Sequence, residues 1–464
     1  MTCVARLGTA VVWVLVSACG SRSALPSDSG TGGSADPCAA PSIPLACAES
    51  IAAAPAGAEV WSRALPVGEL SLLGPVAADE AGSTYYLGAE SALYVKTVYA
   101  LDACGALRWQ ADVSHSIAAS GYVPQVMVAG GRLLLVGIGN IVALHLDTGE
   151  PAFIADLAGF AQGGGLGVPP GKVVGMGFTA ADAQGTVFSL VANDLDVFIV
   201  SVSVTGQMHP VAKVEHYLGG AGYPLGAQQL ALDAAGHVVL AGGTGSGNGE
   251  PIRAFTKSGK AVFDTVLPSF GIGQFLAAGP DFITGRGMWI LDLDGTPRNS
   301  FVGGGPTFIS WDGPTVIDAE GTLYVVGGQH LEPGVSTMTF NLLGRFSPEG
   351  NSEWSATLDE QIVGGPVLDD RGHLFVTTTA KVEPGSPLHL AAIGLNGELA
   401  WQIPLPLAGK TPSYWLLSNA AGALTVAIDG RVHAYSSGGG RPPRCAYWPT
   451  PRGDLGQRVC AREK

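Results

Sequence analysis

Residues 99–109 read Tyr-Ala-Leu-Asp-Ala-Cys-Gly-Ala-Leu-Arg-Trp, a strand-like run with a glycine followed four residues later by an aromatic. The same glycine-to-aromatic spacing recurs along the chain, at Gly105/Trp109, Gly149/Phe153, Gly259/Phe263, Gly350/Trp354 and Gly397/Trp401. Self-similarity at a fixed period indicates a repeat protein. The spacing therefore predicts an architecture before it predicts any chemistry.

A second marker follows the same period, a turn of the form Asp-x-x-Gly. It occurs at Asp79/Gly82, Asp182/Gly185, Asp233/Gly236, Asp318/Gly321 and Asp369/Gly372, with Asn419/Gly422 as a variant. We interpret these as tight hairpins, in which Asp accepts hydrogen bonds from the turn backbone and Gly supplies a positive φ. A calcium loop would need more oxygen ligands at alternate positions. The nearest approach to one is Asp292-Leu293-Asp294-Gly295, which falls where a hairpin is due.

Short β-branched and aromatic runs lie between the turns, as in Ser83-Thr84-Tyr85-Tyr86-Leu87. Four such strands per unit predict an all-β protein, a β-propeller of four-stranded blades. We place the blades at 66–113, 114–156, 157–213, 214–266, 267–301, 302–358, 359–405 and 406–440. The prediction is about eight blades. Seven is the alternative, because Pro210 and Asn299 occupy the aromatic position in the third and fifth units.

The ring needs closing, since an open blade edge exposes unpaired backbone groups. Trp61 lies 48 residues before Trp109, yet it precedes the first complete unit. We therefore expect residues 58–65 to form the outer strand of the last blade, so that the propeller spans 58–440. The tryptophans are expected to pack blade against blade rather than to contact a ligand.

The N-terminal residues predict export. Arg6 precedes an apolar run from Leu7 to Val16 that is too short to span a membrane. Leu15-Val16-Ser17-Ala18-Cys19 is similar to a bacterial lipobox, which predicts a lipoprotein signal peptide at 1–18 and acylation of Cys19. An ordinary secretory signal with a chance cysteine is the alternative. Gly20 after the cysteine favours the outer membrane, and residues 19–57 are expected to be a flexible tether.

The cysteines allow disulfides in an exported chain. The simplest pairs are Cys38 with Cys47 and Cys445 with Cys460, the latter within a C-terminal tail at 441–464. Cys104 lies near the closing strand and could instead pair with a tether cysteine. No Cys-x-x-Cys motif or cysteine–histidine cluster occurs, so no metal site is expected.

Charged residues make up 13% of the chain, and the formal net charge is −14. Because the sequence has no basic stripe, we expect no nucleic-acid partner. We expect a monomer that meets the membrane only through its lipid anchor.

A ligand site is predicted at the face where the outer strand of one blade connects to the next blade. These connections hold Tyr122, Tyr223, Phe270, Trp311 and Tyr414. An aromatic funnel suits a planar ring or a sugar face, although the same residues could merely cap the blade cores. Long loops at 242–250, 327–338 and 379–388 open onto the same face, with His330, Glu332, Lys381, Glu383 and His389. Neither triad spacing nor paired carboxylates occur, and we assign no catalytic residue.

The segment 99–109 resembles the repeats of the pyrroloquinoline-quinone-type propeller superfamily, and the likeness extends across residues 58–440. That group includes quinoprotein alcohol dehydrogenases and a non-enzymatic lipoprotein of the outer-membrane barrel-insertion machinery. The dehydrogenase branch implies a quinone stacked between a Trp and a vicinal disulfide, with a calcium ion and an Asp base. This chain has no adjacent cysteines, so no catalytic residue and no cofactor is carried over.

The sequence thus favours a lipid-anchored propeller of the cell envelope that binds an envelope protein or a glycan through its loop-rich face, without catalysis. The alternative is a quinoprotein-like dehydrogenase, or another enzyme with its site in the central funnel. Acidic residues facing the ring would favour the enzyme.

Overall fold

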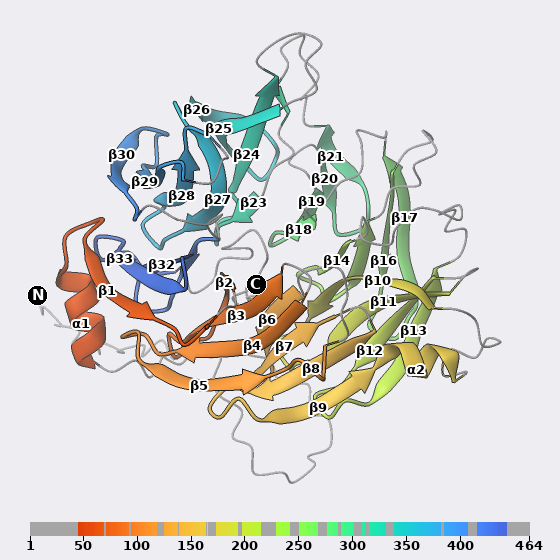
Figure 1. The fold of residues 1–464 in the computed structure, drawn as a ribbon. Coiled ribbons are helices and arrows are strands. Elements are labelled where there is room, and N and C mark those ends of the chain that lie inside the picture. Colours follow the sequence, from red (N-terminus) through yellow and green to blue (C-terminus); the bar gives the residue numbers. More distant parts are fainter. Residues whose placement is uncertain are drawn as a thin grey trace, which may run out of the picture. The chain divides into compact units, whose positions relative to one another are not determined.

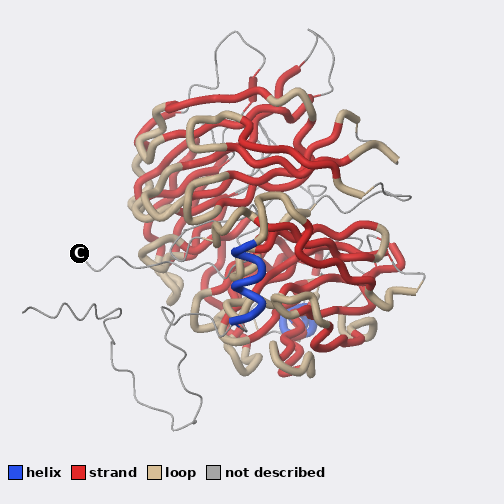
Figure 2. Tube along the Cα trace, turned by 90° about the vertical axis from the view of Figure 1, so that its left-hand side faces the viewer, coloured by secondary structure: helices blue, strands red, loops and turns tan. Residues whose placement is uncertain are grey.

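The computed structural model describes residues 45–68, 71–91, 94–117, 125–137, 139–163, 165, 173–193, 197–214, 229–241, 250–267, 276–285, 289–300, 309–310, 315–330, 338–381, 385–406 and 415–442. These residues belong to one compact unit, 41–460. Their regular secondary structure is almost entirely strand, drawn in red in Figure 2. Two helices occur among them, α1 (Leu45–Ala53) and α2 (Leu157–Gln162).

The strands form eight antiparallel sheets, which we call blades 1 to 8; Figure 1 labels most of their strands. Blade 1 consists of β2 (Ser71–Ala78), β3 (Thr84–Ser91), β4 (Tyr94–Leu101) and β5 (Leu107–Asp112). Blade 2 consists of β6 (Gln125–Ala129), β7 (Arg132–Val136), β8 (Asn140–His145) and β9 (Pro151–Asp156). Blade 3 consists of β10 (Val173–Ala181), β11 (Val187–Asn193), β12 (Val197–Val202) and β13 (Met208–Val214). Blade 4 consists of β14 (Gln229–Leu232), β15 (Val238–Ala241), β16 (Glu250–Phe255) and β17 (Ala261–Leu267).

Blade 5 is β18 (Leu276–Ala278), β19 (Phe282–Gly285), β20 (Trp289–Asp292) and β21 (Pro297–Ser300). Blade 6 has its inner strand in two pieces, β22 (Ile309–Ser310) and β23 (Thr315–Ile317), both paired with β24 (Leu323–His330), followed by β25 (Met338–Phe346) and β26 (Ser352–Thr357). Blade 7 is β27 (Gln361–Leu368), β28 (Leu374–Thr379), β29 (Leu388–Ile393) and β30 (Leu399–Pro404). Blade 8 combines β31 (Leu417–Ser418), β32 (Ala423–Ile428) and β33 (Arg431–Ser436) with β1 (Glu59–Ala64) from the start of the described chain.

Buried clusters join the blades in an unbroken cycle. Each apolar cluster contains strands of consecutive blades, from blades 1 and 2 through blades 7 and 8, and the cluster of Leu72, Tyr86, Tyr99, Ala427 and Val432 joins blade 8 to blade 1. The chain is therefore an eight-bladed β-propeller. The predicted all-β fold and blade positions are confirmed, since each strand falls within one residue of its predicted blade, and the seven-blade alternative is wrong.

The N-terminal strand closes the ring as predicted. β1 is the outer strand of blade 8 and pairs antiparallel with β33, with Trp61 opposite Ala434 and Ala64 opposite Arg431. This pairing covers the free edge that β33 would otherwise expose.

The glycine-to-aromatic repeat is a contact between neighbouring blades. The aromatic in the outer strand of one blade lies against the turn glycine of the next: a Cβ on Gly149 would come 2.5 Å from Cε3 of Trp109, and one on Gly397 would come 2.9 Å from Cε3 of Trp354. The indole nitrogen of Trp109 also donates to the carbonyl of Leu146, at 2.8 Å. The prediction that the tryptophans pack between blades is confirmed at these positions.

Blade 3 forms although Pro210 stands at its aromatic position. The next blade's Gly259 instead approaches backbone, because a Cβ there would come 1.8 Å from the carbonyl oxygen of Val211. Gly57 and Trp61 have the same spacing and form a further pair beyond the five predicted ones. Gly57 lies against Trp401 of blade 7, so the contact occurs at blade 8 as well.

The expected tether at 19–57 needs correction at its end. Residues 45–53 form α1, and its side chains Cys47 and Ile51 are buried against Ala103 of blade 1 and Ala421 of blade 8. The run Leu45–Ala53 is rich in alanine, the strongest helix former, and it gains a packing surface once the ring is closed. Residues 19–44, including Cys19, lie outside the described residues.

Candidate functional site

The two ends of the ring differ in their connections. In an antiparallel four-stranded meander, the first and third hairpins lie at one end, and the second hairpin lies at the other end together with the connection to the next blade. We call these the turn end and the loop end. The predicted site residues Tyr122, Tyr223, Phe270 and Tyr414 fall within loop-end connections, whereas Trp311 falls between β22 and β23, the two pieces of the blade 6 inner strand. All five lie outside the described residues, as do Glu332 and Glu383.

The described inner strands carry no ionisable side chain. β2, β6, β10, β14, β18, β22, β23, β27 and β31 contain only apolar, small, proline, hydroxyl and amide residues. The acidic ring-facing residues that would favour an enzyme are therefore missing from this part of the channel wall.

A polar cluster occupies the loop end of blade 7, and we call Glu360, Thr378, His389 and Gln402 the Glu360 cluster. One carboxylate oxygen of Glu360, Oε2, accepts from Thr378 Oγ1 at 2.6 Å, His389 Nδ1 at 2.9 Å and Gln402 Nε2 at 3.0 Å. Glu360 and His389 remain 19% and 25% exposed, so the cluster is open to solvent.

Strand alternation explains why these residues meet. Leu374 and Val376 of β28 face blade 6 in the core between blades 6 and 7, so Thr378 points the same way. Ala391 of β29 faces the same core, and His389 lies two residues before it. Glu360 ends the connection between β26 and β27, which brings its carboxylate over the three strands.

The Glu360 carboxylate fixes the tautomer of His389. An ionised carboxylate only accepts hydrogen bonds, so Nδ1 of His389 carries the hydrogen and Nε2 of the neutral ring is an acceptor. No described residue donates to Nε2, or to Oε1 of Glu360. With the imidazole neutral, the cluster offers two acceptors to a group that donates hydrogen bonds.

Sequence reasoning placed His389 at this face but missed its partners. Glu360 follows no motif, and Thr378 and Gln402 are ordinary strand residues. The available signal was position alone: a carboxylate directly before an inner strand lies at the loop end. Lys381, also a described loop residue, uses its carbonyl to accept from Thr379 Oγ1 at 2.8 Å, which closes the base of the loop. His330 is the last residue of β24 and pairs with Met338.

The Asp-x-x-Gly segments at the turn end are hydrogen-bonded hairpins, as predicted. Asp79 Oδ1 accepts from the Ser83 amide at 2.7 Å, Oδ2 accepts from Tyr85 Oη at 2.8 Å, and burial raises the pKa of the carboxyl. At the equivalent turns Asp233 and Asp369 bond the histidine four residues on, through Nδ1 of His237 and His373.

The segment resembling a calcium loop is a hairpin. The Gly295 amide donates to the carbonyl of Asp292 at 2.9 Å, and the Asp292 carboxylate accepts from Arg298 Nε. Within the described part of the chain, no group of three or more His, Cys, Asp or Glu side chains could hold a metal ion.

The predicted pairing of Cys38 with Cys47 is wrong. Cys47 of α1 forms a disulfide with Cys104, in the turn between β4 and β5, which confirms the alternative that Cys104 pairs with a tether cysteine. The prediction paired Cys47 with Cys38 because the two are close in sequence, but the packing of α1 on blade 1 brings Cys47 to Cys104. Cys38, Cys445 and Cys460 lie outside the described residues.

A shallow groove of about 220 Å³ runs between the outer strand of blade 1 and the β8–β9 turn of blade 2, lined among others by Asp112, Thr148 and Glu150. None of the predicted site residues lines it. Neither described helix is long and apolar enough to cross a membrane.

The fold defines the class of the protein, an eight-bladed β-propeller. No known family model matches the chain, and no curated protein matches it. Among solved structures, the chain is similar to the Dos1 propeller, with a TM-score of 0.49 and 10% identity over 81% of this chain and 97% of that one.

A second similar structure is the WD40 domain of SCAP from fission yeast, with a TM-score of 0.48 and 12% identity over 81% of this chain and 98% of that one. These similarities concern the fold alone. The likeness to pyrroloquinoline-quinone-type repeats stays a prediction.

Proposed function

We propose that this protein is a lipid-anchored propeller of the cell envelope, at the outer membrane, that binds an envelope protein or a glycan through its loop end without catalysis. The observation that carries the binding proposal is the Glu360 cluster. Its free acceptors, Oε1 of Glu360 and Nε2 of His389, suit the hydroxyl groups of a glycan or the amides of a protein. We predict that the aromatic side chains of Tyr122, Tyr223, Phe270, Trp311 and Tyr414 would supply further stacking surfaces for the ligand.

The Cys47–Cys104 disulfide supports export, because disulfides persist in oxidising compartments. Anchoring rests on the lipobox-like sequence that ends at Cys19. It is tested by metabolic labelling with a palmitate analogue, comparing the wild-type protein with Cys19→Ala. Label in the wild-type chain and none in the variant supports the anchor; equal labelling, or none in either, contradicts it.

Binding is tested with matched variants of neighbouring carboxylates. The wild-type propeller, Glu360→Gln and Asp359→Asn are immobilised and exposed to an oligosaccharide array and to detergent-solubilised envelope proteins. Asp359 is exposed, and it adjoins Glu360 in the chain. We expect Glu360→Gln to weaken capture by at least about tenfold, the loss of one charge-assisted hydrogen bond, with Asp359→Asn unchanged. Equal capture by all three would exclude the Glu360 cluster.

The dehydrogenase alternative has its own test. Tight binding to the folded state raises the melting temperature. A saturable rise with pyrroloquinoline quinone and calcium would replace the non-catalytic proposal, and no rise would support it.

A further inference from the structure

The ring seam between β1 and β33 joins the two ends of the propeller. β1 contributes six residues, of which four are exposed and only Val60 and Trp61 are half-buried. Its partner strand lies far along the chain, since Glu59 bonds His433 across 374 residues. Bringing such distant segments together costs closure entropy that the hairpins inside the other blades avoid.

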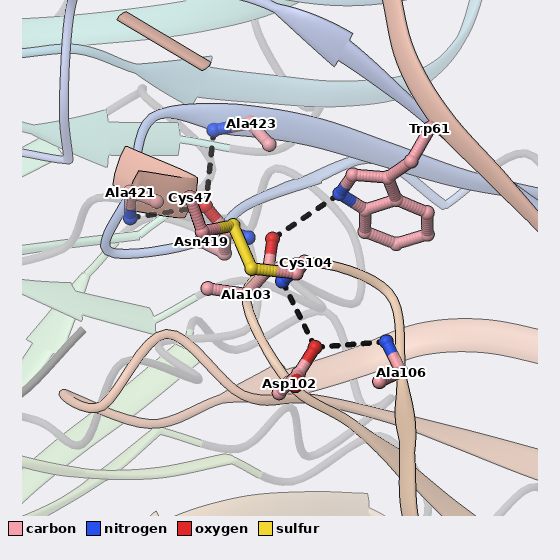
Figure 3. Close-up of a disulfide and its surroundings, with 9 residues drawn as sticks. All are labelled: Cys47, Trp61, Asp102, Ala103, Cys104, Ala106, Asn419, Ala421 and Ala423. Atoms are coloured by element: carbon pink, nitrogen blue, oxygen red, sulfur yellow. Dashed lines mark hydrogen bonds between the residues drawn. A yellow bond between two sulfur atoms is a disulfide. The ribbon is translucent and has the colours of Figure 1, made fainter. Parts of the chain in front are cut away.

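Residues 45–64, which contain α1 and β1, are anchored to blade 1 at the turn Asp102–Ala106. Figure 3 shows both attachments: the Trp61 indole nitrogen donates to the Ala103 carbonyl at 3.1 Å, and Cys47 is bonded covalently to Cys104. Asp102 Oδ1 holds the turn in shape by accepting from the Cys104 and Ala106 amides, at 2.9 and 2.8 Å. Neither attachment involves β33.

Without the disulfide, little would hold α1 on the ring. Ile51 is the one large buried side chain outside the cystine among the helix side chains that the structure describes, and it clusters with Ala103, Ala421, Ala423 and Ala434 of blades 1 and 8, which bury little area. Val60 and Trp61, which also pack on this cluster, belong to β1 of the same N-terminal segment. Ser436 Oγ adds hydrogen bonds to the carbonyls of Ile51 and Ala54, at 3.1 and 3.0 Å. Those bonds come from β33, so they are lost together with the β1–β33 pairing if the seam opens.

We propose that the Cys47–Cys104 disulfide is a redox latch on the ring seam. When oxidised, it holds residues 45–64 on blade 1, so that β1 stays in place to pair with β33. A dithiol reductant donates two electrons and two protons; the S–S bond breaks, two cysteine thiols form, and the reductant becomes a cyclic disulfide. Cys104 is exposed in its turn, so a reductant can reach the bond. The seam then opens by local unfolding while the other blades stay closed.

The test is hydrogen exchange on the full exported chain. Oxidised wild-type protein is folded, divided, and one half is reduced with dithiothreitol, with thiol alkylation and mass spectrometry to verify that Cys47 and Cys104 are free. We expect backbone amides of β1 and β33 to exchange at least tenfold faster after reduction, and amides of β28 and β29 in blade 7 to keep their rates. Unchanged exchange at the seam would overturn the latch, as would equal acceleration in every blade.

Two variant proteins provide the controls. Cys47→Ser/Cys104→Ser should reproduce the reduced state, whereas Cys445→Ser/Cys460→Ser, which removes two other cysteines, should leave seam exchange as in the oxidised wild type. Faster seam exchange in the second variant would contradict the assignment to Cys47–Cys104. If Cys47→Ser/Cys104→Ser fails to fold, the reduced wild-type sample still decides, because that protein folds before the bond is cut.

Discussion

Trp61 lies against Gly105 across the closure of the ring. A Cβ built on Gly105 would come 2.5 Å from Cε3 of Trp61, and Gly105 has a φ of +80°. The contact matches that of Trp109 on Gly149, so the last blade docks on the first as ordinary neighbours dock. Two features require glycine at position 105: the positive φ of its backbone and the indole ring packed against it.

Gly105→Ala tests the docking contact. The left-handed conformation costs about 1–2 kcal/mol for alanine, and displacing the indole adds about 1–3 kcal/mol. Gly131→Ala is the matched control, because Gly131 has a φ of +69° and open space within 4 Å. We expect urea denaturation to show a loss for Gly105→Ala about 2 kcal/mol larger than for Gly131→Ala. Equal losses would show that the indole moves at no cost.

Asn419→Asp tests why blade 8 departs from the Asp-x-x-Gly pattern. Asn419 is fully buried, its Oδ1 accepts from the Ala421 and Ala423 amides at 3.0 Å each, and its Nδ2 has no partner among the described residues. A carboxylate there would be buried without a compensating charge, at a cost of about 3 kcal/mol near neutral pH.

The pH dependence of the free energy of unfolding shows whether the loss in Asn419→Asp comes from the introduced charge. Burial raises the folded-state pKa of the introduced carboxyl above its unfolded value, so the loss is small at low pH and grows as pH rises through the folded pKa. Asn351→Asp, in an exposed turn, should change the free energy of unfolding by less than about 0.5 kcal/mol. A loss independent of pH would point to packing rather than charge.

Asp79→Asn tests the buried turn carboxylates. Because burial raises the pKa of Asp79, its contribution to stability is fully present below the unfolded pKa of about 3.9 and is lost as pH rises through the folded pKa. Relative to the variant, the wild-type protein should therefore lose stability as the pH is raised from the unfolded pKa of about 3.9 through the folded pKa. Urea unfolding across this range measures the difference.

Asp294→Asn provides a control of opposite sign. Hydrogen bonds from Thr296 lower the pKa of Asp294, so its contribution is present above the unfolded pKa and is lost as pH falls. The same trend in both variants would contradict the burial argument for Asp79.

Removing the disulfide should cost more than any single turn substitution. Cys47 and Cys104 are 57 residues apart, and closing a loop of that length is worth about 4 kcal/mol in the chain-entropy model. Cys47→Ala/Cys104→Ala should lower the free energy of unfolding by about that amount in urea. A loss below about 1 kcal/mol would mean that the unfolded chain is already compact near these residues.

The blades could be predicted because their signals are local. Turn residues such as Asp79 and Gly82 act within one hairpin, and the alternating strands follow within the same unit, so every blade carries its own evidence. The closing strand could be placed for the same reason, since Trp61 keeps the repeat spacing. The Glu360 cluster could not, because its members come from one connection and three strands and share no spacing.

The four-stranded blades, their positions and the closure of the ring follow from the amino-acid sequence alone, through turn chemistry and strand periodicity that repeat within each unit, and the structure decided between eight blades and seven. Tertiary structure alone decided that Cys47 bonds Cys104 rather than Cys38, that α1 packs on blades 1 and 8, and that Glu360 meets His389. These contacts depend on the distance between residues after the ring has closed. No local pattern encodes that distance, because it is set by the packing of one blade on the next.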